Sequence, residues 1–161
     1  MRIFFDTNVL ASGLMGHGLC RDLLDRALIG HVVLLGAPVR EELRRVLTTK
    51  FRVPDVLWRE LGLRLRELDH APEATAPLRA PVPDPDDVPI LACAIAAKAG
   101  AFVTGDKALL ALRRIEAMPI VSPRQLWQKL TGVVRGCSWI RAQINLDDFE
   151  LAIGGIEHCG T

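Results

Sequence analysis

The sequence lacks an apolar run long enough to span a membrane. Its longest candidate, residues 88–97, contains Pro89 and ends at Lys98, whereas a spanning helix needs about 20 consecutive apolar residues. A basic segment followed by an apolar signal core is also missing at the N-terminus, because Asp6 interrupts the first apolar segment. We therefore expect a cytoplasmic protein that has no membrane partner.

Cysteine and histidine do not form a zinc-binding pattern. The four cysteines are widely spaced without a C-x-x-C pair, and the four histidines show no ligand spacing. We expect the cysteines to be reduced thiols, with Cys93 in the core. The residues concerned are Cys20, Cys93, Cys137, Cys159, His17, His31, His70 and His158.

Excess charge of one sign is absent too. The net charge is only +1, so bulk electrostatics gives no support for nucleic-acid binding, and any basic footprint must be local. A solvated helix face is the simpler interpretation of each basic group. The candidates are Arg40, Arg44, Arg45, Lys50, Arg52, Arg64, Arg66, Arg113 and Arg114.

Short apolar runs alternate with helical patterns along the chain. The length of 161 residues and the 50% hydrophobic content favour one globular domain with a real core. We predict strands at residues 3–5, 32–35, 101–104 and 119–121. We predict helices at residues 19–28, from Pro38 onward, and at 55–70, 87–99, 107–114 and 123–130. Residues 71–85 contain five prolines and predict a loop or extended connection.

This alternation predicts an α/β fold with three layers, α/β/α, around a central parallel sheet of four to five strands. In such sheets the ligand crevice lies at the carboxyl ends of the strands. Asp6 follows the first predicted strand, and Asp106 closes the segment 102–106 (FVTGD). Both carboxylates are therefore expected at that edge of the sheet.

Two further acids are predicted to point inward from helices. At about 100° per residue, Glu42 falls beside the apolar stripe of its helix, whereas Glu41 points away from it. Asp87 likewise shares a face with Ile90 and Leu91. An inward carboxylate is costly unless it is paired or bound to a metal.

Each acid also has a simpler interpretation. Asp87 or Asp106 could be a helix N-cap, which is a frequent role for aspartate. Glu42 could pair with Arg45 or Arg44. Four carboxylates in one chain, however, favour a site for a hard divalent cation, Mg²⁺ or Mn²⁺, which prefers oxygen ligands.

Four segments, taken in their order along the sequence, carry a family resemblance. They are residues 5–10 (FDTNVL), 41–47 (EELRRVL), 84–92 (DPDDVPILA) and 103–107 (VTGDK), with 120–123 (IVSP) following. Over about residues 1–130 the chain resembles PIN-domain proteins, in particular the VapC-like ribonuclease toxins of bacterial type II toxin–antitoxin systems. Residues 131–161 show no such resemblance, and a helical extension or a loose tail is equally compatible with them.

The resemblance implies a PIN-like nuclease domain that cleaves RNA with a water activated by Mg²⁺ or Mn²⁺, together with a cognate antitoxin. It assigns metal binding and catalysis to Asp6, Glu42, Asp87 and Asp106. It also implies that Asn8 and Thr104 support the acids through hydrogen bonds. Asp86 could replace Asp87 as a ligand. We expect Asp6 and Asp106 to be the main ligands, and Glu42 to orient water or contact a second ion.

Other functions compete with this hypothesis. A non-catalytic PIN-like module that binds RNA or protein would keep the fold, although intact acids at all four positions argue against it. A phosphoacceptor domain would need adjacent acids after the first strand and a lysine after the last. The chain has Thr7 and Ser122-Pro123 there. We also expect a homodimer, formed through exposed apolar surface at Leu57, Leu61, Leu65 and Leu68.

Overall fold

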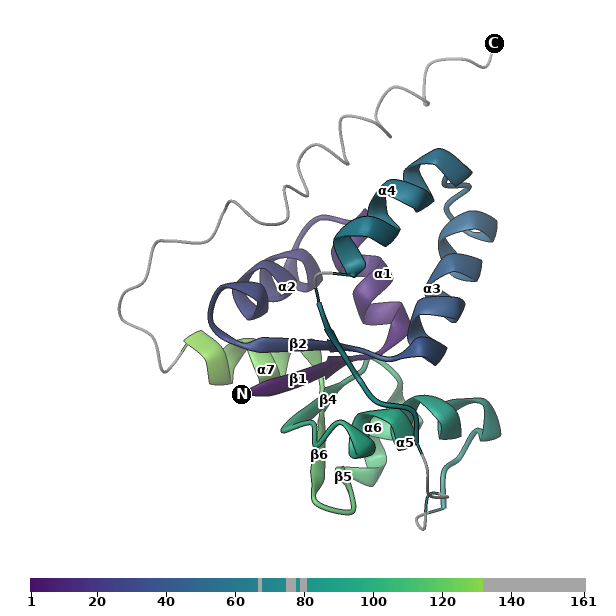
Figure 1. The fold of residues 1–161 in the computed structure, drawn as a ribbon. Helices are drawn as coiled ribbons and strands as arrows, with labels where there is room; N and C mark the ends of the chain where they lie inside the picture. Colours follow the sequence, from purple (N-terminus) through teal and green to yellow (C-terminus); the bar gives the residue numbers. More distant parts are fainter. Residues whose placement is uncertain (67, 75–77, 79–80, 132–161) are drawn as a thin grey trace.

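The computed structural model describes residues 1–66, 68–74, 78 and 81–131 (Figure 1). The strands are β1 (Arg2–Phe5), β2 (Val32–Leu35), β3 (Asp69–His70), β4 (Ala101–Val103), β5 (Arg114–Ile115) and β6 (Met118–Val121). The helices are α1 (Thr7–Met15), α2 (Leu19–Gly30), α3 (Ala37–Thr49), α4 (Asp55–Leu65), the 3₁₀ turn η1 (Pro85–Asp87), α5 (Val88–Ala96), α6 (Lys107–Leu112) and α7 (Pro123–Thr131).

One sheet organises these elements, with the strand order β3-β2-β1-β4-β6-β5. Every pairing is parallel except that of β5 with β6. Strand β1 lies at the centre, between β2 and β4. The chain continues from β1 toward β2 on one side and from β4 toward β6 on the other. This reversal is the topological switch point at which parallel α/β sheets bind ligands, beyond the carboxyl ends of the strands.

Helices cover both faces of the sheet (Figure 1). Helix α2 packs against α1 and α7 on one face, while α6 packs against β6 and lies with α5 on the other. This arrangement follows from right-handed crossovers, which place helices on opposite faces when the chain moves in opposite directions across the sheet. The predicted α/β/α layers are therefore confirmed.

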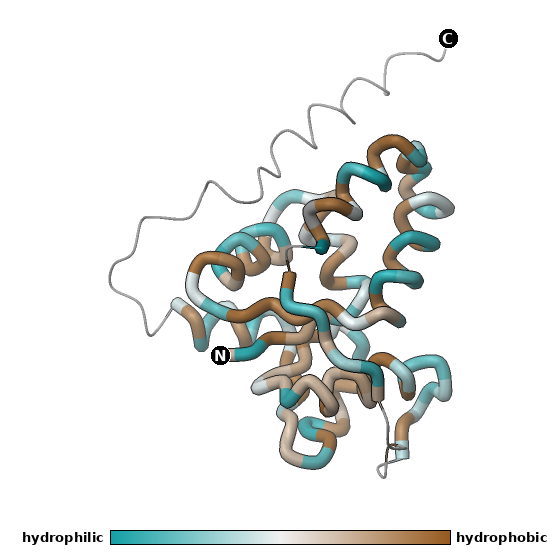
Figure 2. Tube along the Cα trace, viewed as in Figure 1, coloured by the Kyte–Doolittle hydropathy of each residue, from teal (hydrophilic) through white to brown (hydrophobic). Residues whose placement is uncertain are grey.

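The core lies between the sheet and these helices. In Figure 2 the apolar segments run along the central strands, and polar residues alternate with apolar ones along the helices. Phe4 on β1 stacks against Phe102 on β4 with ring centroids 5.8 Å apart. Cys93 is a buried free thiol, as predicted, and Cys20 is a half-buried one. The polar residues at the strand ends therefore lie directly beside a buried, closely packed core.

The strand count departs from the prediction, because the sheet has six strands rather than four to five. The additional strands have two residues each. β3 falls within residues 55–70, which were predicted to be helical throughout, and β5 begins at the end of the predicted helix 107–114. A two-residue strand has no apolar alternation of its own. It exists through its pairing with a neighbouring strand, which local sequence does not encode.

The surface proposed for a homodimer was assigned to the wrong leucines. Leu61 and Leu65 are in the core, and Leu57 and Leu68 are half-buried against it. The large exposed apolar side chains of α4 are Val56 and Leu63. The pattern of leucines marked the face of α4 that packs inward, so it gave no information on the outer face.

Two other expectations concern membranes and the end of the chain. Among the described residues, no helix has the length and apolar character required to cross a membrane. The predicted C-terminal extension, residues 131–161, lies outside the described residues except for Thr131, which ends α7. The boundary between the predicted domain, residues 1–130, and the predicted extension, residues 131–161, thus stays a prediction.

Candidate functional site

Asp6 and Thr104 meet at the ends of two neighbouring strands. Asp6 directly follows β1 and is only 6% exposed, and Thr104 directly follows β4 and is fully buried. The Thr104 hydroxyl donates a hydrogen bond of 2.7 Å to Oδ2 of Asp6. The backbone N–H of Asp6 is held as well, by a 2.9 Å bond to the Val103 carbonyl. The pairing of β1 with β4 therefore fixes this carboxylate in position.

Asp106 lies on the same edge and caps α6. Its Oδ1 accepts hydrogen bonds from the backbone N–H groups of Ala108 at 2.6 Å and Leu109 at 3.3 Å. Its own N–H donates to the Thr104 hydroxyl oxygen at 3.0 Å. The capping interpretation is therefore correct for this exposed aspartate. Because Thr104 contacts both Asp6 and Asp106, one buried hydroxyl links the two acids.

Glu42 reaches the site from α3. Thr7, the fully buried first residue of α1, donates its hydroxyl to Oε2 of Glu42 at 2.7 Å. Oε1 of Glu42 lies 3.7 Å from a guanidinium nitrogen of Arg45. Glu42 thus points toward the strand ends, as the helical geometry predicted, while Glu41 is exposed. Of the two arginines considered as partners, Arg45 makes the pair.

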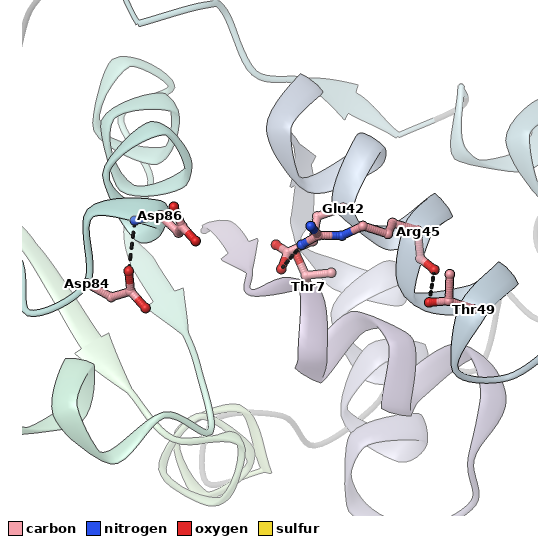
Figure 3. Close-up of polar contacts among 6 residues, drawn as sticks. All are labelled: Thr7, Glu42, Arg45, Thr49, Asp84 and Asp86. Atoms are coloured by element: carbon pink, nitrogen blue, oxygen red, sulfur yellow. Dashed lines mark hydrogen bonds and ion pairs between the residues drawn. The ribbon is translucent and has the colours of Figure 1, made fainter.

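Asp87 is the last residue of the capped 3₁₀ turn η1. Oδ1 of Asp84 accepts a 2.9 Å hydrogen bond from the N–H of Asp86, and this bond begins η1. Asp87 ends that turn and precedes α5 without making a side-chain capping bond. The capping interpretation, correct for Asp106, does not apply here. Figure 3 shows Asp84 and Asp86 on the side of the site opposite Glu42.

The four acids act on one another electrostatically. Burial, together with the charges of Asp6, Asp84, Asp106 and Glu42, raises the pKa of Asp87 from 3.8 to about 6, and burial makes the largest contribution. Burial also raises the pKa of Asp6, with additional contributions from Glu42 and Asp106, although the Thr104 hydrogen bond opposes this rise. Acids from the β1 end, α3, η1 and the β4 end therefore share one electrostatic environment.

This donor set suits a hard divalent cation in its chemistry. It consists of carboxylate oxygens that repel one another, and a cation among them would relieve that repulsion. The described residues do not, however, contain three such side chains already gathered into a compact ligand group. Like charges without a cation favour separation, so the side chains would have to close in on an ion. Asp6, Asp87, Asp106 and Glu42 are the residues that could hold it.

Sequence reasoning overlooked two residues of this site. Thr7 was considered only as the residue that follows Asp6, and Asp84 only as part of the segment 84–92. The signal for Asp84 was present, since an aspartate before Pro85 is typical of a helix cap. Thr7 gave no such signal, because its partner is 35 residues away. Asn8 is exposed, and its supporting role stays a prediction.

Comparison with solved structures extends the description of the fold. The chain is similar to a chain in the crystal structure of VapBC2 from Rickettsia felis bound to a DNA fragment from their promoter. The TM-score is 0.58 at 18% sequence identity, and the match covers 76% of this chain and 98% of that one. At this identity the likeness establishes the fold alone. No curated protein sequence matches the chain.

Comparison with protein families identifies the domain. The model described as the PIN domain matches residues 2–108, which include all four acids together with Thr7, Asn8 and Thr104. The match spans more than half of the chain, and the α/β/α fold agrees with it. This protein therefore belongs to the PIN domain family.

Proposed function

We propose that this protein is a metal-dependent endoribonuclease that acts as the toxin of a toxin–antitoxin pair. The observation that carries the proposal is that buried threonine hydroxyls hold Asp6 and Glu42 at the strand ends, each at 2.7 Å. The charges of Asp6, Asp106 and Glu42 also add to the raised pKa of Asp87. A fold without a use for these charges has no reason to gather them at a strand edge, because each one costs folding free energy. Family membership supports a nuclease over other uses of such a cluster.

In this proposal some residues bind the metal ion and others orient its ligands. Asp6, Asp87, Asp106 and Glu42 would hold Mg²⁺ or Mn²⁺, which supplies a water of lowered pKa and neutralises charge on the phosphate. Thr104 fixes Oδ2 of Asp6 through its hydroxyl. Oδ1 of Asp106 accepts the two hydrogen bonds that cap α6, so Oδ2 is the oxygen that could bind the metal ion.

Glu42 is also oriented by a threonine hydroxyl, that of Thr7 on α1. Its Oε2 accepts the Thr7 hydroxyl, and its Oε1 faces the exposed Arg45. A carboxylate held in this way can accept a proton from a water that attacks an RNA phosphodiester bond, or can contact a second ion. Asp87, rather than Asp86, is the third ligand in this proposal, because its charge interacts with those of the other three acids.

The partners follow from the same proposal. The similar structure is titled as VapBC2 bound to DNA, and we propose that this chain likewise has a cognate antitoxin. We keep the homodimer as part of the proposal, now with Val56 and Leu63 as its exposed apolar residues. The cytoplasm is the location at which such a toxin would meet cellular RNA.

The decisive experiment is cleavage of a labelled RNA pool in Mg²⁺ or Mn²⁺ and in EDTA. We compare the wild type with Asp6→Asn/Asp106→Asn. Asparagine retains the shape of each side chain and can still cap α6, so the folded protein should persist while a ligand charge is lost at each position. Cleavage that requires the metal and disappears in the variant supports the proposal. A folded wild type that cuts no RNA in either metal contradicts it.

A non-catalytic PIN-like module that binds RNA or protein is the second candidate. The observation in its favour is that, in the part of the chain that the structure describes, no three ligands are already gathered into a compact group. The two functions differ in their response to metal. A binding module would retain its RNA affinity in the asparagine variant and show no cleavage in Mn²⁺.

A further inference from the structure

Glu42 carries two different contacts on its two oxygens. Oε2 accepts a short hydrogen bond of 2.7 Å from the buried Thr7, whereas Oε1 lies 3.7 Å from Arg45. The glutamate side chain is 30% exposed and that of Arg45 is 73% exposed. Figure 3 shows the arginine folded back along α3 toward Glu42 and Thr7. One contact is therefore internal and fixed, and the other lies at the outer rim.

The outer contact is weak. A separation of 3.7 Å is longer than a well-formed N–H···O hydrogen bond, for which about 2.9 Å is usual. Exposed pairs of this kind contribute little to stability, because water screens both charges and a long side chain loses freedom. The guanidinium can therefore leave Glu42 at small cost when a better anion is present.

A phosphate group is such an anion. The planar guanidinium presents paired N–H donors that match two oxygens of a phosphate, which a single carboxylate oxygen at this distance does not offer. The four acids repel an RNA backbone, so a cationic side chain beside them would favour its approach. Within residues 1–131, apart from the gaps that the structure leaves undescribed, Arg45 is the basic side chain that pairs with one of these acids.

We propose that Arg45 is a substrate-binding residue, whose guanidinium moves from Oε1 of Glu42 to a backbone phosphate of the bound RNA strand. This inference rests on the proposed ribonuclease function. The exchange makes and breaks only ionic contacts, and the total charge is unchanged. It leaves Oε1 of Glu42 open to the site while Thr7 keeps Oε2 in place. Substrate entry would thus complete the acidic site.

The helix offers a matched control in Arg44. It is also exposed, but at about 100° per residue it lies about 160° from Glu42 around the helix axis, whereas Arg45 lies only about 60° away. Arg44→Ala therefore removes the same charge from the same helix without removing the contact. Arg45→Lys keeps the charge and removes the planar fork.

The first measurement is RNA affinity without cleavage, in EDTA, for the wild type, Arg45→Ala, Arg45→Lys and Arg44→Ala. We expect Arg45→Ala to weaken binding about tenfold and to reduce the slope of affinity against salt by about one counterion. Arg45→Lys should recover part of the affinity, and Arg44→Ala should change it less than about twofold. Equal losses in Arg45→Ala and Arg44→Ala would overturn the proposal.

Cleavage kinetics and Mn²⁺ binding separate this inference from the proposed function. In a cleaving wild type, Arg45→Ala should raise KM with kcat little changed, and Mn²⁺ affinity measured by calorimetry should not fall, since a competing cation has been removed. A fall in Mn²⁺ affinity would overturn the inference by making Arg45 a support for the site. If RNA binds through Arg45 but is not cut, the inference stands and ribonuclease activity is refuted. If the wild type binds no RNA, both are refuted.

Discussion

The hydroxyl of Thr104 donates a 2.7 Å hydrogen bond to Oδ2 of Asp6, across 98 residues of sequence. The same oxygen of Thr104 accepts the N–H of Asp106 at 3.0 Å. A donor inside the protein favours the charged form of Asp6, which burial and the neighbouring acids disfavour. One buried threonine thus offsets part of the cost of keeping two acids at the end of the sheet.

Thr104→Val tests this relationship. Valine matches threonine in shape and lacks the hydroxyl, so Asp6 loses a donor and the Asp106 N–H loses an acceptor. We expect the free energy of unfolding at pH 7 to fall by about 1–3 kcal/mol, and the pKa of Asp6 to rise further. Urea unfolding measures the first effect, and NMR titration of the carboxyl carbon measures the second.

The control for Thr104→Val is Thr49→Val, which removes an exposed hydroxyl bonded only to the Arg45 carbonyl at 2.6 Å. It should change stability by less than about 0.5 kcal/mol. Thr104→Ser, which retains the hydroxyl, should keep the pKa of Asp6 close to that of the wild type. An unchanged Asp6 titration in Thr104→Val would show that the bond does not stabilise the charged acid.

The pH dependence of the metal-free protein provides a second prediction. Asp87 has a pKa raised from 3.8 to about 6, so between these values the folded state binds more protons than the unfolded state. Stability must therefore fall as pH rises through this window. The stabilisation present below about pH 4 is lost by about pH 6, and the raised pKa of Asp6 acts in the same direction.

Asp87→Asn should remove much of this loss. In EDTA at pH 7 we expect the variant to be more stable than the wild type by about 1 kcal/mol, a figure reduced for solvent screening because Asp87 is only half-buried. Urea unfolding at pH 4.5 and pH 7 measures it, with the exposed Asp86→Asn as the matched control. Mn²⁺ should then stabilise the wild type more than Asp87→Asn. Equal pH profiles for all three proteins would contradict the electrostatic description.

The elements that local sequence encodes were predicted well. Pro38 lies in the first turn of α3, and the buried runs that become β1, β2, β4 and β6 were all identified. Glu42 pointed inward as its helical phase required. These features depend on residue spacing, on the restricted backbone of proline and on burial, all of which can be read within about ten residues.

Long-range pairing set the limit of prediction. β3 exists because Asp69 and His70 pair with Leu34 and Leu35, and no pattern in those two residues foretells it. The bond from Thr7 to Glu42 joins α1 to α3 for the same reason. The outer face of α4 was misjudged because a stripe of leucines identifies the buried side of a helix, whereas exposed apolar residues are recognised only after the packing is known.

Self-association through α4 provides a third prediction. Val56 and Leu63 are 67% and 64% exposed and lie seven residues apart, so they share one face of the helix. We expect Val56→Glu/Leu63→Glu to lower the mass measured by light scattering from a dimer to a monomer. Leu19→Glu, which alters an exposed leucine at the start of α2, should leave the dimer intact. A wild type that is monomeric at every concentration would refute the homodimer.

A close contact between α3 and α5 provides the last prediction. Gly36 precedes α3, and a Cβ added there would lie 2.7 Å from Sγ of Cys93 on α5 and 3.0 Å from Cζ of Phe4. Both neighbours are buried, so neither can move aside freely. We expect Gly36→Ala to lower the free energy of unfolding by about 1–3 kcal/mol, measured by urea unfolding. Gly62→Ala, where nothing lies within 4 Å, should instead stabilise α4 by up to about 1 kcal/mol.

The contact with Cys93 can be isolated by a double-mutant cycle. Cys93→Ala removes Sγ and leaves a Cβ 3.5 Å from the added methyl group, so Gly36→Ala should cost less in that background, with a coupling of about 1 kcal/mol. Relief will be incomplete, because Phe4 remains in place. Since α3 carries Glu42 and α5 follows Asp87, the contact also sets how closely these two acids approach. Additive effects of the two substitutions would show that Phe4, and not the thiol, limits the approach of α3 to α5.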